Sequence, residues 1–144
     1  MLRTHPDPDT RRFAAYALGN FDNPRASTAL REVLANQSEQ PAVRAMAAEH
    51  LVYEKSAIPD LLAALRDRSR EVRFWSAYAL GEGRVQRALL PLRRLTSDRA
   101  LVPGWWSVAR EARWAIATIE GGWTKVSPDP SKPVKGVAAR PAHD

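Results

Sequence analysis

Apolar and small residues recur along most of the chain at intervals of three and four positions, the spacing of one face of an α-helix. The clearest segments are residues 14–18 and 75–80, where alanine, leucine and aromatic residues follow this spacing. No stretch alternates strictly between apolar and polar residues, as a half-buried strand would. The pattern therefore predicts an all-α fold.

A short motif is repeated letter for letter inside these helices. Tyr-Ala-Leu-Gly stands at residues 16–19 and again at 78–81, and in both copies an arginine lies five residues before the tyrosine. Two weaker copies give four arginines in all, distributed at similar intervals along the chain: Arg11, Arg44, Arg73 and Arg113. A period of this kind is typical of a repeat protein, and it predicts four related helices, which we call the A helices.

A second apolar-periodic segment follows each of the first three A helices. These B helices cover residues 26–34, 58–65 and 88–95, and each has a proline in or just before its opening turn, where a missing amide donor costs least. The sequence thus predicts seven helices in antiparallel pairs, with a last A helix that lacks its B helix. We expect Gly19 and Gly81 to end their A helices in the left-handed conformation that glycine adopts most easily.

Paired helices that recur with this period, with Val72-Arg73 opening an A helix and Ala-Leu-Gly closing it, resemble HEAT repeats. More narrowly, they resemble the short HEAT-like repeats of the phycobilin (PBS) lyase type. The resemblance covers residues 9–121 and implies an α-solenoid of about three and a half repeats, with A helices on the convex face and B helices on the concave face. The sequence departs from the pattern at Val52-Tyr53, which replaces the closing glycine, and in the last repeat, which stops half-way.

The resemblance also implies a role for the repeated arginine. In HEAT-like repeats this residue typically pairs with an aspartate of an adjoining turn, and the candidates here are Asp7 or Asp9, Asp67 and Asp98. Such charge-assisted hydrogen bonds would tie one repeat to the next. The alternative is an anion-binding ladder, because stacked repeats place equivalent side chains in a line. We favour the structural role.

Changes of composition mark the limits of the repeat domain. We expect an N-terminal loop at residues 1–8, the repeat domain at 9–123, and a flexible tail rich in proline and lysine at 124–144. The tail lacks the large apolar residues that would offset the entropy of ordering it. Inside the domain, residues 99–107 interrupt the helical pattern, and Pro103-Gly104 predicts a turn there.

Composition narrows the class of protein. The 144 residues are 44% apolar and 26% charged, which is typical of a globular protein, and the chain has no cysteine for disulfides, thiolate metal sites or nucleophilic catalysis. The net charge is +6, and the part that precedes the tail carries +4, which permits weak attraction to acidic partners or nucleic acid. No apolar run approaches the roughly 20 residues of a membrane span, so we expect a cytoplasmic protein without membrane contact.

No set of residues predicts catalysis, a metal site or a cofactor. The three histidines, His5, His50 and His143, do not share the spacing of metal ligands, and the acidic residues are dispersed. The glycines lack the sequence context of a phosphate-binding loop. We expect a protein that is not an enzyme, and we expect His50 to have a structural role at a helix interface.

The surface of the B helices is the first candidate binding site. Five arginines flank its apolar positions and are predicted to project from the concave face: Arg31, Arg66, Arg87, Arg93 and Arg94. Such a row would hold an acidic peptide or phosphate groups. The alternative is an ordinary solvated face, because Glu32 and Asp60 reduce the positive charge there.

Tryptophans near the end of the repeats are the second candidate site. Four lie within nineteen residues: Trp105, Trp106, Trp114 and Trp123. Large aromatic rings gather where a partner docks or where a solenoid closes its open end. We favour the second explanation, in which the other three rings cover the apolar face of the last A helix around Trp114, Ile116 and Ile119.

These observations favour a protein–protein interaction scaffold or adaptor that binds another protein or peptide. The first alternative is a nucleic-acid-binding module that uses the basic concave face. The second, implied by the PBS lyase resemblance, is an accessory subunit of a bilin-lyase-like complex. Self-association through the ends of the solenoid is a further expectation, since a stack without polar caps exposes unburied interface at each end.

Overall fold

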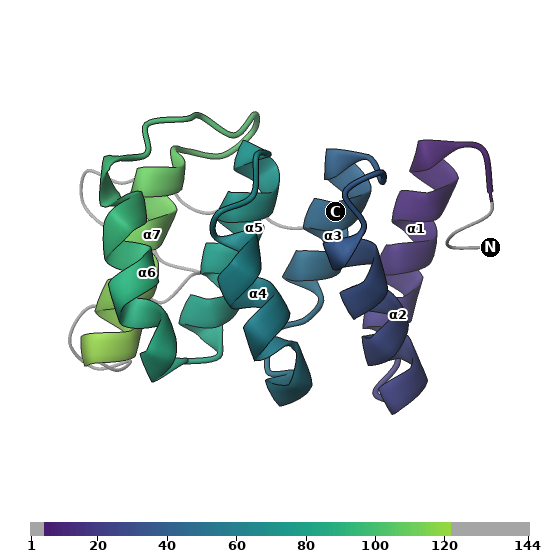
Figure 1. Ribbon diagram of the computed structural model, residues 1–144, viewed down its shortest axis with the longest axis horizontal. Helices are drawn as coiled ribbons and strands as arrows, with labels where there is room; N and C mark the ends of the chain where they lie inside the picture. Colours follow the sequence, from purple (N-terminus) through teal and green to yellow (C-terminus); the bar gives the residue numbers. More distant parts are fainter. Residues whose placement is uncertain (1–4, 122–144) are drawn as a thin grey trace.

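Seven α-helices make up the computed structural model, which describes residues 5–121 (Figure 1). Their bounds are α1 (Pro8–Gly19), α2 (Pro24–Ala35), α3 (Pro41–Glu49), α4 (Ile58–Ala64), α5 (Arg70–Glu82), α6 (Leu89–Arg94) and α7 (Val108–Gly121). Short 3-10 turns precede α4 (Lys55–Ala57) and α6 (Gln86–Ala88), and another follows α6 (Leu95–Ser97). The predicted number and order of helices are confirmed over this part of the chain.

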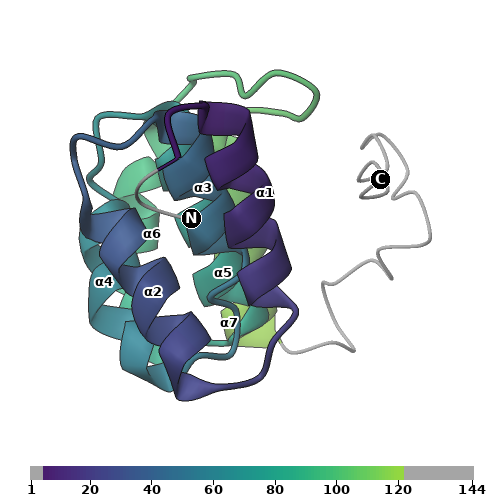
Figure 2. The same ribbon diagram turned by 90° about the vertical axis from the view of Figure 1, so that its right-hand side faces the viewer.

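The helices form two layers. The A helices α1, α3, α5 and α7 stand side by side in one layer, and the B helices α2, α4 and α6 form the other (Figures 1 and 2). Each of α2, α4 and α6 runs antiparallel to the A helix that precedes it, whereas α7 has no following B helix within the described chain (Figure 1). The fold is an all-α solenoid, as the repeat pattern predicted.

Side chains and prolines fix where the helices begin. The Asp7 carboxylate accepts hydrogen bonds from the backbone N–H groups of Asp9 and Thr10, and Asn23 and Ser69 cap α2 and α5 in the same way. Proline occupies the first turn of α1, α2, α3 and α4, where it removes a donor that would have no partner inside the helix.

The core lies between the two layers and repeats with the sequence. Leu30, Leu61 and Leu92 occupy equivalent positions in the three B helices, and all three are buried. The A helices meet them with small residues at equivalent positions, including Ala15, Ala48 and Ala77, each fully buried. Small side chains allow the two layers to approach closely, so that packing is dense without large aromatic residues in every repeat.

The glycines of the repeated motif do not have the predicted role. Gly19 and Gly81 are absent from the positive-φ residues of the described chain, so the expectation of a left-handed helix end is wrong. A Cβ atom on Gly81 would lie 2.8 Å from the Cα of Ala115, and one on Gly19 would lie 2.5 Å from the Cβ of His50. The motif needs glycine because the next A helix passes too close for any side chain.

Left-handed backbone occurs instead in the turns between A and B helices. Tyr53 (φ 65°) and Arg84 (φ 51°) adopt it after α3 and α5, at equivalent places in their repeats. Residues 99–107 form a loop before α7 in which Gly104 has φ 80° and Leu101 pairs with Ser107 in an isolated bridge. The turn predicted at Pro103-Gly104 is therefore confirmed.

Candidate functional site

The exposed side of the B helices holds the arginines singled out from the sequence. Arg31 on α2 pairs with Asp60 on α4 at 2.8 Å, and Arg93 on α6 pairs with Glu120 on α7 at 2.6 Å. These two arginines bridge neighbouring repeats, so each has an acidic partner within the chain. Their charge is therefore partly neutralised.

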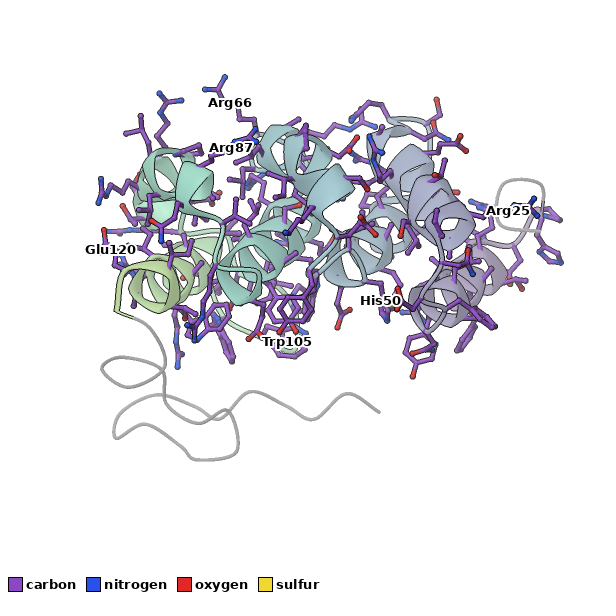
Figure 3. All side chains as sticks on the ribbon, turned by 90° about the horizontal axis from the view of Figure 1, so that it is seen from below. Arg25, His50, Arg66, Arg87, Trp105 and Glu120 are labelled. Atoms are coloured by element: carbon purple, nitrogen blue, oxygen red, sulfur yellow. The ribbon has the colours of Figure 1, made fainter. Side chains whose placement is uncertain are left out.

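Three other arginines differ from this pair. Arg66, Arg87 and Arg94 are exposed, and within residues 5–121 their side chains make no hydrogen bond, ion pair or ring contact. Arg66 follows the C-terminal end of α4, while Arg87 and Arg94 lie just before and at the end of α6. Arg66 and Arg87 project on the side of the molecule away from His50 and Trp105 (Figure 3). We call Arg66, Arg87 and Arg94 the basic surface of α4 and α6.

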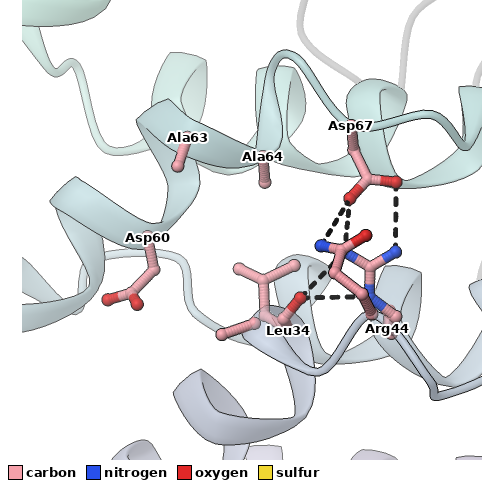
Figure 4. Close-up of a pocket in the computed structure, with 8 residues that line it drawn as sticks. Leu34, Arg44, Asp60, Ala63, Ala64 and Asp67 are labelled. Atoms are coloured by element: carbon pink, nitrogen blue, oxygen red, sulfur yellow. Dashed lines mark hydrogen bonds and ion pairs between the residues drawn. The ribbon is translucent and has the colours of Figure 1, made fainter.

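A buried ion pair joins α3 to the turn that follows α4. The Arg44 guanidinium, 1% exposed, binds both oxygens of Asp67, 3% exposed, and also donates to the backbone oxygen of Leu34 (Figure 4). A cavity of about 110 Å³ adjoins the pair between α2 and α4. Because the polar groups of Arg44 and Asp67 are already engaged, the pair joins repeats and is not available to a ligand.

The pKa of Asp67 reflects this environment. Burial alone would raise it, but hydrogen bonds from Arg44 and from the backbone N–H of Ser69, together with the Arg44 charge, outweigh burial and hold the pKa of Asp67 below its usual value. The carboxylate is therefore ionised at neutral pH and stabilises the fold in that form.

The same arrangement recurs along the stack. Each repeated arginine donates to a backbone oxygen of the segment that precedes its helix, and the first three also bind a carboxylate of the turn that follows their B helix. The carboxylates are Glu39 for Arg11, Asp67 for Arg44 and Asp98 for Arg73. The backbone oxygens belong to His5 and Pro6, Leu34, Asp67 and Thr96, in chain order.

Two of the expected carboxylate partners are confirmed and one is wrong. Asp67 and Asp98 pair as the resemblance implied, but Arg11 binds Glu39 with two hydrogen bonds of 2.8 Å. Asp7 is not its partner because that carboxylate caps α1. Arg113 has no carboxylate partner within the described chain and donates only to the Thr96 backbone oxygen, at 2.9 Å.

Trp105 and Trp106 pack at the side of the stack. Trp105 meets Trp75 of α5 edge to face with ring centroids 5.0 Å apart, and both Trp105 and Trp106 contact Phe74. The Trp106 indole N–H donates to the fully buried Glu111 carboxylate at 2.7 Å. Neither ring lines the open groove beside Ile116 of the last A helix.

Of the two remaining tryptophans, only Trp114 lies within the described residues. Trp114 stacks on Tyr78, with ring centroids 6.0 Å apart and planes 21° from parallel, and so joins α7 to α5. Trp123 lies outside the described residues, as do the predicted tail at 124–144 and His143. The partner-binding role of the four tryptophans stays a prediction.

A hollow on the A-helix side brings aromatic and acidic groups together. Its volume is about 320 Å³, and its walls come from α1, α3, α5 and the loop at 99–107: Arg12, Ala42, Ala45, Met46, Glu49, Glu71, Trp75, Val102, Pro103 and Trp105. A smaller apolar cavity of about 180 Å³ lies between the ends of α3, α4 and α5 beside Tyr53. Neither is recognisable in the sequence, because each forms only when the 99–107 loop or successive repeats come together.

The described histidines have structural contacts. His50 follows α3, and its ring meets Tyr16 of α1 edge to face at 5.3 Å while Nδ1 lies 3.0 Å from the Met46 backbone oxygen. Within residues 5–121, no group of three or more His, Cys, Asp or Glu side chains is placed to hold a metal ion. No helix in that range combines the length and apolar character needed to cross a membrane.

Comparison with known families agrees with this geometry. The family model for HEAT repeats matches residues 1–53 and 38–117, which together make up most of the chain. The chain belongs to the HEAT repeat family. No curated protein matches it.

Membership of the HEAT family gives the surfaces a general meaning. HEAT repeats commonly mediate protein–protein interactions, and proteins built from them are typically non-catalytic scaffolds. In this chain the repeated arginines at Arg11, Arg44 and Arg73 form ion pairs that link segments of the stack. The side chains of the basic surface of α4 and α6 make no such internal contacts. That surface is the candidate contact site.

Proposed function

We propose that the chain is a protein-interaction module whose basic surface on α4 and α6 binds an acidic segment of a partner protein. The observation that carries the proposal is the contrast between arginines. Arg11, Arg31, Arg44, Arg73 and Arg93 have carboxylate partners inside the chain. Arg66, Arg87 and Arg94 are exposed and have none within the described residues.

The charge distribution supports an acidic partner. On α2, Glu32 and the Arg31–Asp60 pair offset the positive charge, whereas Arg66, Arg87 and Arg94 beside α4 and α6 have no carboxylate partner within the described residues. Exposed positive side chains accelerate encounter with an acidic partner and set the register of the complex more than they set its final affinity. Binding should therefore weaken as ionic strength rises.

Charge reversal at the proposed surface tests the function. The native partner is first isolated from the source cells with the full chain and identified, and binding is then measured with the purified pair. We expect the triple variant R66E/R87E/R94E to bind at least tenfold more weakly, because three attractive contacts become repulsive. The matched control R25E/R70E/R99E lowers the net charge equally through arginines away from α4 and α6, and it should bind like the original chain. Equal binding by both variants would remove this surface from the proposal.

A nucleic-acid-binding role is the second candidate, favoured by the same three arginines. Each phosphate contact makes binding strongly dependent on salt, so titration with duplex DNA at two salt concentrations separates this role from peptide binding. Affinity in the micromolar range or tighter near physiological salt would favour DNA.

The resemblance to the PBS lyase type supports a third, narrower role as an accessory subunit of a bilin-lyase-like complex. A change in the absorbance spectrum of an added bilin would support this role. No change on addition of the full chain would remove it.

A further inference from the structure

We propose that the chain forms a two-fold symmetric homodimer through the open face of α7. This inference is independent of the binding partner proposed above, because α7 lies at the end of the stack and the basic surface lies on α4 and α6. Three observations on α7 lead to it.

The first observation is an uncovered groove where a B helix would pack. In the three complete pairs, the alanine four residues after the repeated arginine is fully buried, at Ala15, Ala48 and Ala77. The equivalent Ala117 of α7 is only half-buried. An open groove of about 600 Å³ lies here, lined by Thr96, Arg113, Ile116, Ala117, Glu120 and Gly121.

The second observation is that Arg113 has the backbone partner of the repeated arginine but no carboxylate partner within the described chain. In every complete pair the arginine binds a carboxylate that lies just beyond the C-terminal end of the antiparallel B helix. Arg113 has the backbone oxygen of Thr96 as its only partner in the described chain, and its side chain is exposed. The groove therefore suits an antiparallel helix that carries a carboxylate near its C-terminal end.

The third observation is that α7 is itself such a helix. Along its open face stand Arg113, Ile116, Ala117 and Glu120, at the spacing of one helical stripe. Arg113 and Glu120 are each about 5 Å along the axis from the midpoint between Ile116 and Ala117. A second copy of α7, turned by a two-fold axis through that midpoint, places each Glu120 beside the Arg113 of the other copy.

The groups around the groove fit this arrangement. Glu120 lies at the end of the molecule (Figure 3), where Arg93 donates to its Oε1 atom at 2.6 Å. That contact uses one carboxylate oxygen, so Oε2 is able to accept a second arginine. The small side chain of Ala117 lets two helices approach near the axis, and Ile116 supplies apolar area on each side. A two-fold contact of this kind is self-complementary and closes after two copies.

Exchanging the charges tests the register directly. The interface is small, so we expect a dissociation constant in the range of tens of micromolar, measured by sedimentation equilibrium of the full chain up to about 300 µM. R113E and E120R should each dissociate at least tenfold more readily, because each homodimer then contains two like-charged pairs. An equimolar mixture of the two variants should dimerise again, because its heterodimer restores both opposite-charge pairs.

The controls separate position from net charge. R25E and D22R change exposed residues of the first repeat, away from α7, by the same amounts and should dimerise like the original chain. Thermal melting followed by circular dichroism checks that all variants fold. Three results would each overturn the proposal: a monomer throughout the concentration range, dimers indifferent to R113E and E120R, or a mixture that stays monomeric. The first is also the result expected if residues 122–144 of the same chain cover the groove.

A single cysteine provides a second test, because the chain has none of its own. Ala117 lies next to the proposed axis, so A117C should form a disulfide-linked dimer under mild oxidation. A17C places a cysteine on the exposed face of α1 at the opposite end, near Phe13 and Phe21, which are 65% and 62% exposed. A17C should stay largely unlinked. Preferential linkage of A17C would overturn the proposal in favour of contact through the first repeat.

Discussion

Arg44 and Arg113 occupy the same position of the repeated motif, but they differ in exposure and in their binding partners. Arg44, in the middle of the stack, is 1% exposed and bound to both Leu34 and Asp67. Arg113, in the last helix, is exposed and bound only to the backbone oxygen of Thr96 within the described chain. The motif is the same, but the number of neighbouring repeats is not.

This difference shows that the role of the repeated arginine depends on the B helix that follows it, because the turn after that helix supplies the carboxylate. Arg11 of the first repeat has such a turn and binds Glu39 there, as Arg44 binds Asp67. Arg113 has no such turn after it within the described chain, and its side chain is an exposed surface group. Four variants and conditions test how far this contrast extends.

The largest effect is expected at the middle joint. Arg44→Ala leaves the Asp67 carboxylate buried without its partner, and such losses typically cost about 3–5 kcal/mol of unfolding free energy. Urea denaturation followed by circular dichroism measures this cost. A loss below about 1 kcal/mol would mean that the pair contributes little to the stack.

The next effect is expected where two A helices touch. Gly81→Ala gains helix propensity, but its Cβ would lie 2.8 Å from the Cα of Ala115, so we expect a net loss of about 1–3 kcal/mol. Gly83→Ala is the matched control, because the nearest atom to its Cβ would be the Ala79 backbone oxygen, 3.2 Å away. The same denaturation experiment applies, and equal stability of the two variants would contradict the close-approach explanation.

Acid should weaken the Arg44–Asp67 ion pair, with a smaller loss of unfolding free energy. The pKa of Asp67 is lower in the folded chain than its unfolded value near 4, so its contribution is complete above that value and is lost as the pH falls through the folded pKa. Each unit by which folding lowers the pKa contributes about 1.4 kcal/mol. Measured from pH 5 to pH 2, the unfolding free energy of Asp67→Asn should fall less steeply than that of the original chain. Asp22→Asn, in an exposed turn, should keep the original slope.

The smallest effect on folding is expected at the end of the stack. Arg113→Ala removes one exposed hydrogen bond, so the unfolding free energy of the monomer should change by less than about 0.5 kcal/mol. Dilute protein, well below the concentration of dimer formation, is used for this measurement. A loss comparable to that of Arg44→Ala would show that the two arginines are equivalent after all.

The fold was predictable from the sequence because each helical pair packs mainly on its immediate neighbours. Apolar spacing is sufficient to locate seven helices, and the identical Tyr-Ala-Leu-Gly motifs identify the repeat. The structural role of Gly81 was not predictable in this way. It depends on how near Ala115 comes, and Ala115 belongs to the next A helix along the chain.

The candidate site was predictable only in part. The position of an arginine on or beside a B helix predicts that it is exposed, and Arg66, Arg87 and Arg94 agree. Whether an arginine also finds an acid depends on the next repeat, as for Arg31 with Asp60, or on a turn, as for Arg11 with Glu39. These pairs join residues 28 or 29 positions apart, and apolar periodicity carries no information about them.

The two-sided joint of Arg44 has a consequence for the length of the molecule. Residues 41–69 hold one copy of the repeated arginine, Arg44, together with the carboxylate that binds it and the backbone oxygen that accepts from the next repeated arginine. A tandem duplication of that stretch would bring along every group needed to join the added unit to both sides. The architecture therefore does not fix the number of helical repeats. Chains extended in this way should gain thermal stability with each added repeat, as in a one-dimensional array.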